Sequence, residues 1–341
     1  MSTSTNVTPK GNLTENPASR QKRDFPIPSR LNLAITLCQV SLSFWCLYYT
    51  ANSDSLIGQV VAIVVFSFIM QTGFSLLHEA EHNKLHSKQW INDAQGFVLA
   101  AMFPGSYQLM KVAHLNHHKV NRSDTELVDY YKSGENAIIK TVQYYALISG
   151  LIWLTAPIVT LVVSLTPASL VKRGLNHTEG SAVSTYLAFI QKAGPSKVRA
   201  ETIALILFWV GAWNGLNLDW QSLALCYATF AFSWSSQQYI YHVRTPRHLI
   251  EGAYDLSVWT PIQWLYLNFN FHLQHHKAVN VPWLYMHKRT VDKPKRRYLP
   301  TYIAIWAPPQ PVKEAWPVEF QRRGPLQPRE KGPPECLPQV S

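Results

Sequence analysis

Charged residues are scarce in this sequence. Asp, Glu, Lys and Arg make up 15% of the 341 residues, compared with about 25% in an ordinary soluble domain. An amphipathic soluble helix would carry charge on its outer face. The shortage is concentrated in five runs without charge: Leu31 to Ser53, Ser55 to Leu77, Thr141 to Val171, Thr202 to Leu218 and Trp220 to Tyr241. Each run is near or above the length that crosses about 30 Å of hydrocarbon, which argues for membrane spans and against a soluble protein.

Cysteine is also scarce, and other common signals are missing. The four cysteines form no CxxC pair, so neither a disulfide framework nor a cysteine metal site is indicated. Residues 1–26 have no apolar core of the signal-peptide kind, so the first run is predicted to stay as an anchor. No GxGxxG fingerprint occurs. No basic and aromatic module lies outside the membrane flanks, so no nucleic-acid partner is expected.

Lysine and arginine gather at the edges of the apolar runs, as the positive-inside rule describes. They precede the first run and fill the loop before the fourth: Lys10, Arg20, Lys22, Arg23, Arg30, Lys172, Arg173, Lys192, Lys197 and Arg199. Both regions are therefore predicted to be cytoplasmic, as is the basic segment that starts at Lys288. A basic surface of this kind attracts anionic head groups and acidic protein partners.

These patterns predict an all-α integral membrane protein with about four transmembrane helices in two hairpins, 31–53 with 55–77 and 202–218 with 220–241. The long run 141–171, interrupted by Pro157, is predicted to dip into the membrane and return as a re-entrant or interfacial hairpin. Residues 94–110, broken by Pro104 and Gly105, are predicted to form an interfacial helix.

These patterns predict three regions in the chain. Residues 1–30 are predicted to be a disordered cytoplasmic N-terminus, and residues 31–287 a membrane domain with a cytoplasmic helical cap. Residues 288–341 are predicted to be a basic and then Pro-rich cytoplasmic tail.

Eight of the thirteen histidines fall in three short clusters: His78-Glu-Ala-Glu-His82, His114-Leu-Asn-His117-His118 and His272-Leu-Gln-His275-His276. Positions i, i+3 and i+4 share one helix face, so each cluster directs its imidazoles to one side. Each cluster adjoins the predicted cytoplasmic end of an apolar run or lies between two cytoplasmic segments, so all three can meet. So many imidazoles exceed the four ligands of one tetrahedral zinc, and two metal ions are implied.

The order HxxxH, HxxHH, HxxHH around apolar hairpins resembles the three histidine boxes of membrane fatty-acid desaturases, hydroxylases and related ketolases, over about residues 56–287. The run Gln238-Tyr-Ile-Tyr-His242, followed by Arg247, resembles an extra box in which an amide precedes a ninth ligand. In those family members the amide is asparagine. The resemblance implies that Gln238 holds a metal-bound water and that nine residues bind metal: His78, His82, His114, His117, His118, His242, His272, His275 and His276.

Some neighbouring polar residues are candidates for supporting these ligands. Asp124 and Asp129 follow the second box and can accept a hydrogen bond from a ligand histidine, or simply belong to a solvated loop. His86 is expected to continue the helix face of His78 and His82 by one turn. Asn268 and Asn270 directly precede the third box.

The resemblance implies two non-haem iron ions, O2 as co-substrate and an unactivated C–H bond of a fatty acid or lipid acyl chain as the point of attack. Desaturation is the expected outcome, and hydroxylation and oxidative decarboxylation to a terminal alkene stay open. Because the sequence contains no haem-binding, flavin or dinucleotide module, a separate donor is expected, either a ferredoxin or a cytochrome with its reductase.

Two other classes of protein are alternatives to a di-iron oxidase. The run His78-Glu79-Ala-Glu-His82 matches HExxH, in which two histidines bind zinc and the glutamate activates water, so a membrane zinc metalloprotease is an alternative. It would leave both HxxHH clusters unexplained. A metal or haem transporter would place its polar ligands within the spans, whereas these histidines gather beyond the span ends.

Overall fold

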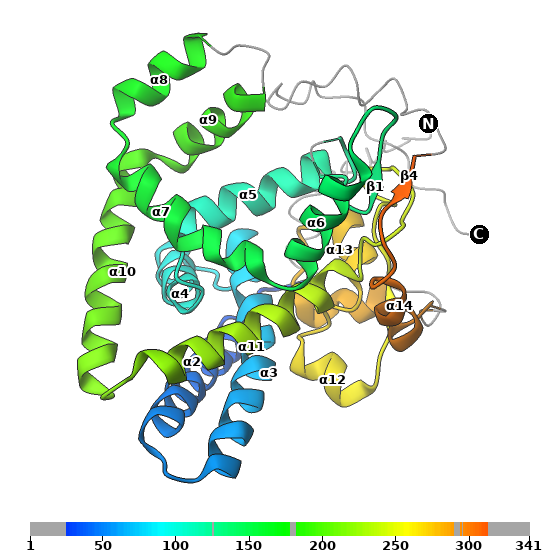
Figure 1. Cartoon of the computed structure of the whole chain (residues 1–341). Helices are drawn as coiled ribbons and strands as arrows, with labels where there is room; N and C mark the ends of the chain where they lie inside the picture. Colours follow the sequence, from blue (N-terminus) through cyan, green and yellow to red (C-terminus); the bar gives the residue numbers. More distant parts are fainter. Residues whose placement is uncertain (1–24, 125, 178–181, 290–293, 295, 313–341) are drawn as a thin grey trace, which may run out of the picture.

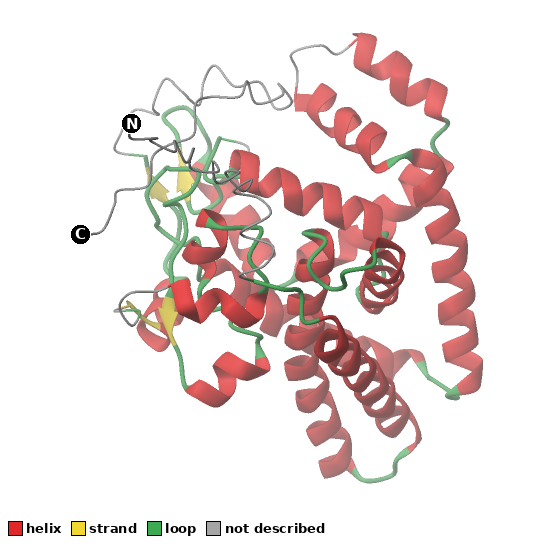
Figure 2. Ribbon diagram, turned by 180° about the vertical axis from the view of Figure 1, so that it is seen from behind, coloured by secondary structure: helices red, strands yellow, loops and turns green. Residues whose placement is uncertain are grey.

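The computed structural model describes residues 25–124, 126–177, 182–289, 294 and 296–312. Within these residues the chain is mostly helical, so the predicted all-α class is confirmed (Figure 2). Two small parallel sheets join distant segments. Their strand pairs are β1 (Tyr130–Tyr131) with β4 (Gln310–Pro311), and β2 (Leu256–Ser257) with β3 (Arg296–Arg297). The predicted N-terminal segment up to residue 24 and the end of the chain from residue 313 lie outside the described residues.

The first predicted hairpin is formed by α2 (Ser29–Asn52) and α3 (Leu56–Glu81). Ser55 caps α3 by accepting a hydrogen bond from the backbone of Gly58, which satisfies one free amide of the first turn. Both helices are long and apolar enough to cross a membrane by length and composition. The two helices lie side by side in Figure 1, joined by a short turn.

The second predicted hairpin corresponds to α10 (Pro195–Gly215) and α11 (Trp220–Tyr239), with Asp219 capping α11. Helix α11 matches the predicted run 220–241 closely, whereas α10 begins seven residues before the predicted run 202–218. Among the described residues only α2 and α3 are apolar enough as single helices to count as spans. Lys197, Arg199 and Glu201 begin α10, and α11 ends in a Ser- and Gln-rich stretch. The crossing of α10 and α11 therefore stays a prediction.

The long run 141–171 is broken at Gly150 and not at Pro157. The chain bends by 78° between helix α6 (Ala137–Ile148) and the segment Leu151–Leu165. This segment consists of the 3-10 helix η1 (Leu151–Leu154) and α7 (Thr155–Leu165). Gly150 has a φ of 92°, in the left-handed region that glycine tolerates. Pro157 lies in the first turn of α7, where its missing N–H costs no helical hydrogen bond.

The histidine-bearing helices pack around this frame. A turn at residues 103–106, near the predicted break, separates α4 (Gln89–Met102) from α5 (Tyr107–Val120), which carries the second box. Helix α9 (Ala182–Ala193) packs along α5, and α8 (Ala168–His177) packs on α9. Val112 of α5 packs in one apolar cluster with Ala193 and Val198.

The C-terminal part of the described chain consists of short helices. These are α12 (Thr260–Leu265), α13 (His272–Lys277), the 3-10 helix η2 (Trp283–Arg289) and α14 (Tyr298–Ala304). Residues 296–312, which the sequence assigned to the tail, lie against the helical body. Ile305 is fully buried there and belongs to the same apolar cluster as Tyr241 and Leu256.

An aromatic core supports the end of α3 that carries the first box. Phe74 lies edge-on to Trp234, with ring centroids 4.6 Å apart, and also contacts Phe103. Trp153 from η1 contacts Trp234 and Phe230. Aromatic pairs of this kind contribute about 0.5–1.5 kcal/mol each beyond their buried area, so the core holds α3, η1 and α11 together next to the first histidine box.

Replacing Gly150 with Ala is expected to destabilise the protein by more than about 1 kcal/mol. The new Cβ would lie 2.4 Å from the carbonyl carbon of Ala231, and the positive φ would be strained. Gly211→Ala is the matched control, because nothing lies within 4 Å of its Cβ position in α10. Thermal unfolding in detergent measures both variants. An unchanged midpoint for Gly150→Ala would contradict the role of Gly150 at this bend.

Candidate metal centre

The nine histidines singled out by the sequence converge in two groups. Within each group the ring nitrogens lie within 4.8 Å of one another. The five-histidine group consists of His78, His82, His114, His118 and His275, and the four-histidine group of His117, His242, His272 and His276. The second and third boxes contribute to both groups, so adjacent residues such as His117 and His118 serve different groups.

Each histidine stands at the end of a helix or on a short helix. His78 is in the last turn of α3 and His82 caps its C-terminus. The second box ends α5, the third box lies on α13, and His242 follows the end of α11. Asp255 positions α13, since its carboxylate accepts hydrogen bonds from the backbone and side chain of Gln274.

The distances between ring nitrogens fit a shared metal ion in each group. In the five-histidine group, Nε2 of His118 lies 3.2 Å from Nε2 of His82, 3.0 Å from that of His114 and 3.0 Å from that of His275. In the four-histidine group, Nε2 of His242 and Nε2 of His272 are 3.0 Å apart. Two nitrogen ligands about 2.1 Å from one metal and at right angles are separated by about 3 Å.

Burial keeps these imidazoles neutral. Desolvation, followed by the neighbouring basic groups, lowers the pKa of His82 to about 3 and that of His118 to about 2. Burial also lowers the pKa of His242, His272 and His275 well below the usual range. Neutral imidazole is the form that binds metal, and several lone pairs facing one another are stabilised by a cation between them. The donor set therefore fits two metal ions.

Two histidines of the four-histidine group are fixed through their outer nitrogens. Nδ1 of His117 lies 2.7 Å from a carboxylate oxygen of Glu126, and Nδ1 of His242 lies 2.8 Å from the carbonyl oxygen of Gly252. A hydrogen bond at Nδ1 sets the tautomer and directs the lone pair of Nε2 toward the metal position. Glu126 was not predicted, because it stands between Asp124 and Asp129 in one acidic loop and no sequence signal separates the three.

The two predicted carboxylates hold the loop that follows α5. Asp124 forms ion pairs with Arg247 and Lys132. Asp129 is buried and lies 2.6 Å from Nη1 of Arg122, and its other oxygen accepts a hydrogen bond from the backbone N–H of Arg244. Through these contacts the loop after the second box is fastened to the segment after His242.

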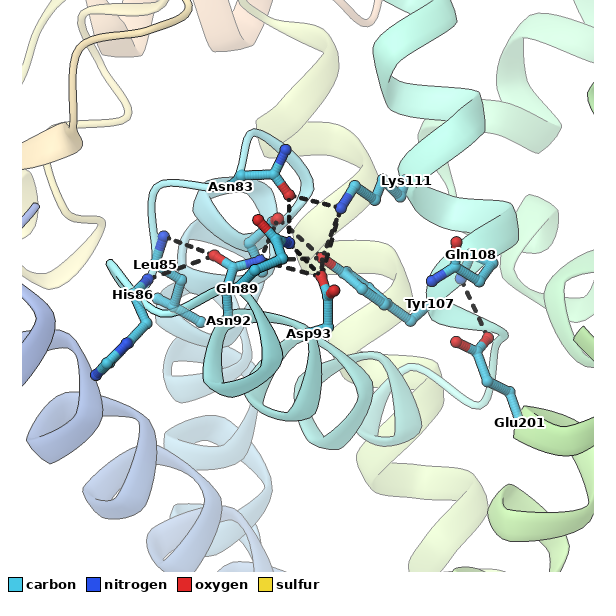
Figure 3. A network of polar contacts seen from close by, with 11 residues as sticks. Asn83, Leu85, His86, Gln89, Asn92, Asp93, Tyr107, Gln108, Lys111 and Glu201 are labelled. Atoms are coloured by element: carbon cyan, nitrogen blue, oxygen red, sulfur yellow. Dashed lines mark hydrogen bonds and ion pairs between the residues drawn. The ribbon is translucent and has the colours of Figure 1, made fainter. Parts of the chain in front are cut away.

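Of the other residues predicted to support the ligands, Asn268 and Asn270 lie next to the third box, whereas His86 lies in a loop. Asn268 donates to the carbonyl of Trp283 and Asn270 donates to that of Leu256, so both shape the turn before α13. Helix α3 ends at Glu81, so the expectation that His86 continues its face is wrong. His86 lies in the following loop, where its Nδ1 accepts a hydrogen bond from the backbone of Lys88 at 2.9 Å, and its ring points away from Lys111 (Figure 3).

A polar network ties the first box to the second (Figure 3). The hydroxyl of Tyr107 donates to the carbonyl of Ala80 at 2.8 Å, and Lys111 donates to the side chain of Asn83 at 2.7 Å. Asn92 of α4 donates to the same carbonyl of Ala80 at 3.0 Å. The network fixes the end of α3 against α4 and α5, and the motifs alone did not indicate it.

A cavity adjoins both histidine groups. It has an empty volume of about 640 Å³, including the part open to solvent. Its wall combines apolar, polar and histidine side chains: Phe74, Leu147, Trp234, Phe269, Ser235, Gln238, Tyr239, His78, His114, His117, His242 and His272. Gln238 therefore borders the same space as the histidines, and its amide donates to Oε1 of Gln71 at 3.3 Å.

Comparison with known families settles the class of this chain. The model of the family described as fatty acid desaturase matches residues 55–307. The chain belongs to the fatty acid desaturase family. The match includes all nine histidines of the two groups. A comparison with curated proteins yields no match.

Membership of the fatty acid desaturase family makes this protein an oxidoreductase with a lipid substrate and a membrane association. The family uses iron, and the two histidine groups are of a kind that holds metal ions. The two apolar helices α2 and α3 fit a membrane protein. In this desaturase-family chain the matched region extends past the third box to α14, in agreement with the packing of residues 296–307 on the helical body.

Replacing Glu126 with Gln is expected to weaken metal binding about 10- to 100-fold. Glutamine has no charge to stabilise the polarised imidazole of His117, although its shape is similar. Asp124→Asn is the matched control, because Asp124 pairs with Arg247 and Lys132 in the same loop. Competition with a chelator measures the loss of metal. Equal retention of metal in both variants would contradict a role for Glu126 at His117.

Proposed function

We propose that this chain catalyses the O2-dependent oxidation of an unactivated C–H bond in a fatty acid or lipid acyl chain, with two iron ions as cofactor and desaturation as the outcome. The observation that supports this most directly is the division of nine histidines into two adjoining groups beside a largely apolar cavity. Hydroxylation, or oxidative decarboxylation to a terminal alkene, is the alternative outcome at the same centre.

In this proposal the five-histidine group holds one iron and the four-histidine group the other. When bound and reduced by two electrons, an iron pair supplies the activation of O2 that attack on an alkane C–H bond requires. Nine histidines exceed the three protein ligands of a catalytic zinc site. The side chains of the protein position the substrate and exclude water.

The cavity wall is suited to positioning an acyl chain. Phe74, Leu147 and Trp234 offer apolar contacts that exclude water from the reacting carbon. Gln238 lies on the same wall, and its position one turn before His242 allows it to hold a water molecule near the four-histidine group. The smaller number of histidines in that group leaves room for such a ligand.

The electron donor and the topology complete the proposal. The chain accepts electrons from a separate ferredoxin, or from a cytochrome with its reductase. The basic residues around the spans support cytoplasmic N- and C-termini and a cytoplasmic metal site. We place α10 and α11 as a second membrane hairpin and the bent pair of α6 and α7 as the re-entrant element, within a membrane domain beginning at residue 31.

The proposed reaction is tested by supplying the purified, iron-loaded chain with O2, a reduced donor and fatty acids of several lengths. Mass spectrometry identifies the products. An alkene two hydrogens lighter than the substrate supports desaturation. An added oxygen identifies hydroxylation, and a terminal alkene with release of CO2 identifies decarboxylation. Absence of any O2-dependent product across acyl substrates would contradict the proposal.

Replacing Glu79 with Gln separates the oxidase from a metalloprotease. Glu79 is buried, and its Oε2 accepts a hydrogen bond from the backbone N–H of Trp283 at 3.1 Å, which a glutamine oxygen can also accept. The variant is expected to keep its iron and most of its oxidase activity, whereas His78→Ala loses both. In a zinc protease the same change removes the general base. A variant that binds metal but is inactive, in a protein that cleaves peptides, would reverse the assignment.

A further inference from the structure

Two short helices near the end of the described chain expose large apolar side chains. On and beside α12, Trp259 is 73% exposed and Trp264 48% exposed. On α14, Leu299 is 65% and Ile303 64% exposed. Neither helix is long enough to span a membrane. Exposed groups of this size at one place mark a surface that meets something other than water.

The two helices are fastened side by side to the end of α11. Tyr266, which caps α12, and Tyr298 of α14 both donate to Oε1 of Gln237, at 2.8 and 3.0 Å. Tyr302 contacts the hydroxyl of Ser236 at 3.1 Å, one helical turn along α14. Tyr298 and Tyr302 face α11, and Leu299 and Ile303 lie on a neighbouring face of α14, about 100° around the helix, that is exposed. Figures 1 and 2 both show α12 and α14 as neighbours at one edge of the molecule.

The depth of α12 in the membrane follows from the place where it contacts α3. The carbonyl of Leu265 accepts a hydrogen bond from Thr72, and that of Tyr266 accepts one from Ser75. The 26 residues of α3 measure about 39 Å, which exceeds a hydrocarbon core of about 30 Å by about 9 Å. Ser75 lies six residues before the end of α3, which is about 9 Å along the helix. With Leu56, the first residue of α3, placed at the far edge of the hydrocarbon, the end of α12 meets α3 where hydrocarbon gives way to head groups.

The types and charges of the residues around α12 and α14 agree with a position at the level of the head groups. Tryptophan is enriched at the interface between membrane and water. Two exposed basic residues, Arg296 and Arg297, directly precede α14. Strand β3, which contains Arg296 and Arg297, leads directly into α14 and pairs with β2, which precedes α12. Apolar groups beside basic groups are the pattern of a surface that lies in anionic head groups.

We infer that α12 and α14, with Trp259, Trp264, Leu299 and Ile303, form a second membrane contact, which lies in the head-group layer and continues the lipid-facing surface of α3. We call it the α12–α14 surface. Its ligand is the lipid bilayer, with anionic head groups bound by the neighbouring side chains of Arg296 and Arg297. The surface requires only that α3 spans the membrane, so it does not depend on the identity of the reaction.

Spin labels in lipid nanodiscs test this inference. The four native cysteines are replaced, and iron content is checked to establish that this background is folded. Single cysteines are then introduced as Trp259→Cys and Ile303→Cys. Val61→Cys, exposed on α3, is the lipid reference, and Ser133→Cys, exposed in the loop after β1, is the water reference. Collision rates with O2 and with a water-soluble nickel chelate report the surroundings of each label.

Labels at positions 259 and 303 are expected to favour O2 over the nickel chelate at least several-fold relative to position 133. They are also expected to move deeper when the nanodisc contains anionic lipid, and Arg297→Gln should reduce that movement. Nickel accessibility equal to that of position 133 would overturn the inference. Dipolar broadening between labels, lost on dilution with unlabelled protein, would also overturn it, because it would show that a second copy covers this surface.

Discussion

Replacing His118 with Ala is expected to abolish turnover and to remove iron from the five-histidine group while the protein stays in the membrane. His118 contacts three other histidines of the group through Nε2. The His118→Ala variant therefore lacks the ligand that lies between the others. Because the iron would be bound too weakly to stay in place, activity is expected to fall at least about 100-fold. Metal analysis and turnover of the purified variant give the two readouts.

His248→Ala is the matched control for this variant. His248 lies in a loop, where its Nδ1 accepts hydrogen bonds from the backbone N–H groups of Ile250 and Glu251. The control is expected to keep its iron and its activity, apart from a small loss of stability. His117, His275 and His276 are expected to behave as His118 does. Full activity in any two of these four variants would show that the ligand assignment is wrong.

Replacing His242 with Ala is expected to be as severe as replacing His275. His242 lies outside the three main histidine boxes and is brought to the four-histidine group by the end of α11. Its Nε2 lies 3.0 Å from that of His272, and Gly252 fixes its outer nitrogen. Removing it leaves three histidines to hold the second iron, so the variant should lose about one iron per chain and its turnover.

Gln238→Ala provides the contrast for His242. Gln238 borders the cavity but contacts the centre only through a water molecule in the proposed arrangement. The variant is expected to keep much of its iron and to turn over slowly. An active His242→Ala protein with a full complement of iron would show that the ninth ligand was wrongly assigned and that the resemblance is limited to the three boxes.

The histidines could be identified from the sequence because ligand spacing is a local property. The spacings i, i+3 and i+4 place imidazoles on one helix face, and the order of the clusters carries the family resemblance. The division into five and four could not be predicted. It depends on the angle at which α5 and α13 meet, which sends His117 and His118 to different groups.

The supporting residues were harder to predict because they depend on loop conformation. Arg122 and Arg244 bind Asp129, and this leaves Glu126 beside His117. His86 was misplaced because Asn83 turns the chain with a φ of 57° directly after α3. A helix end of this kind is decided by a few local contacts that the periodicity of the sequence does not contain.

The membrane arrangement was predictable only in part for a similar reason. The long apolar stretches of α2 and α3 are evident from composition. The bend at Gly150 depends on close packing against Ala231, so the more visible Pro157 was chosen as the break. The packing of α14 depends on contacts between residues far apart in sequence, such as Tyr302 with Ser236.

In the proposed centre, nine histidines hold two iron ions in separate, adjoining sites. Mössbauer spectroscopy of the protein purified after growth on ⁵⁷Fe, with total metal measured on the same sample, tests it most directly. We expect about two irons per chain in nitrogen-rich, non-haem surroundings, with one of the two lost in His242→Ala. A single tightly bound zinc per chain, or one iron whose signal is unchanged by His242→Ala, would contradict it.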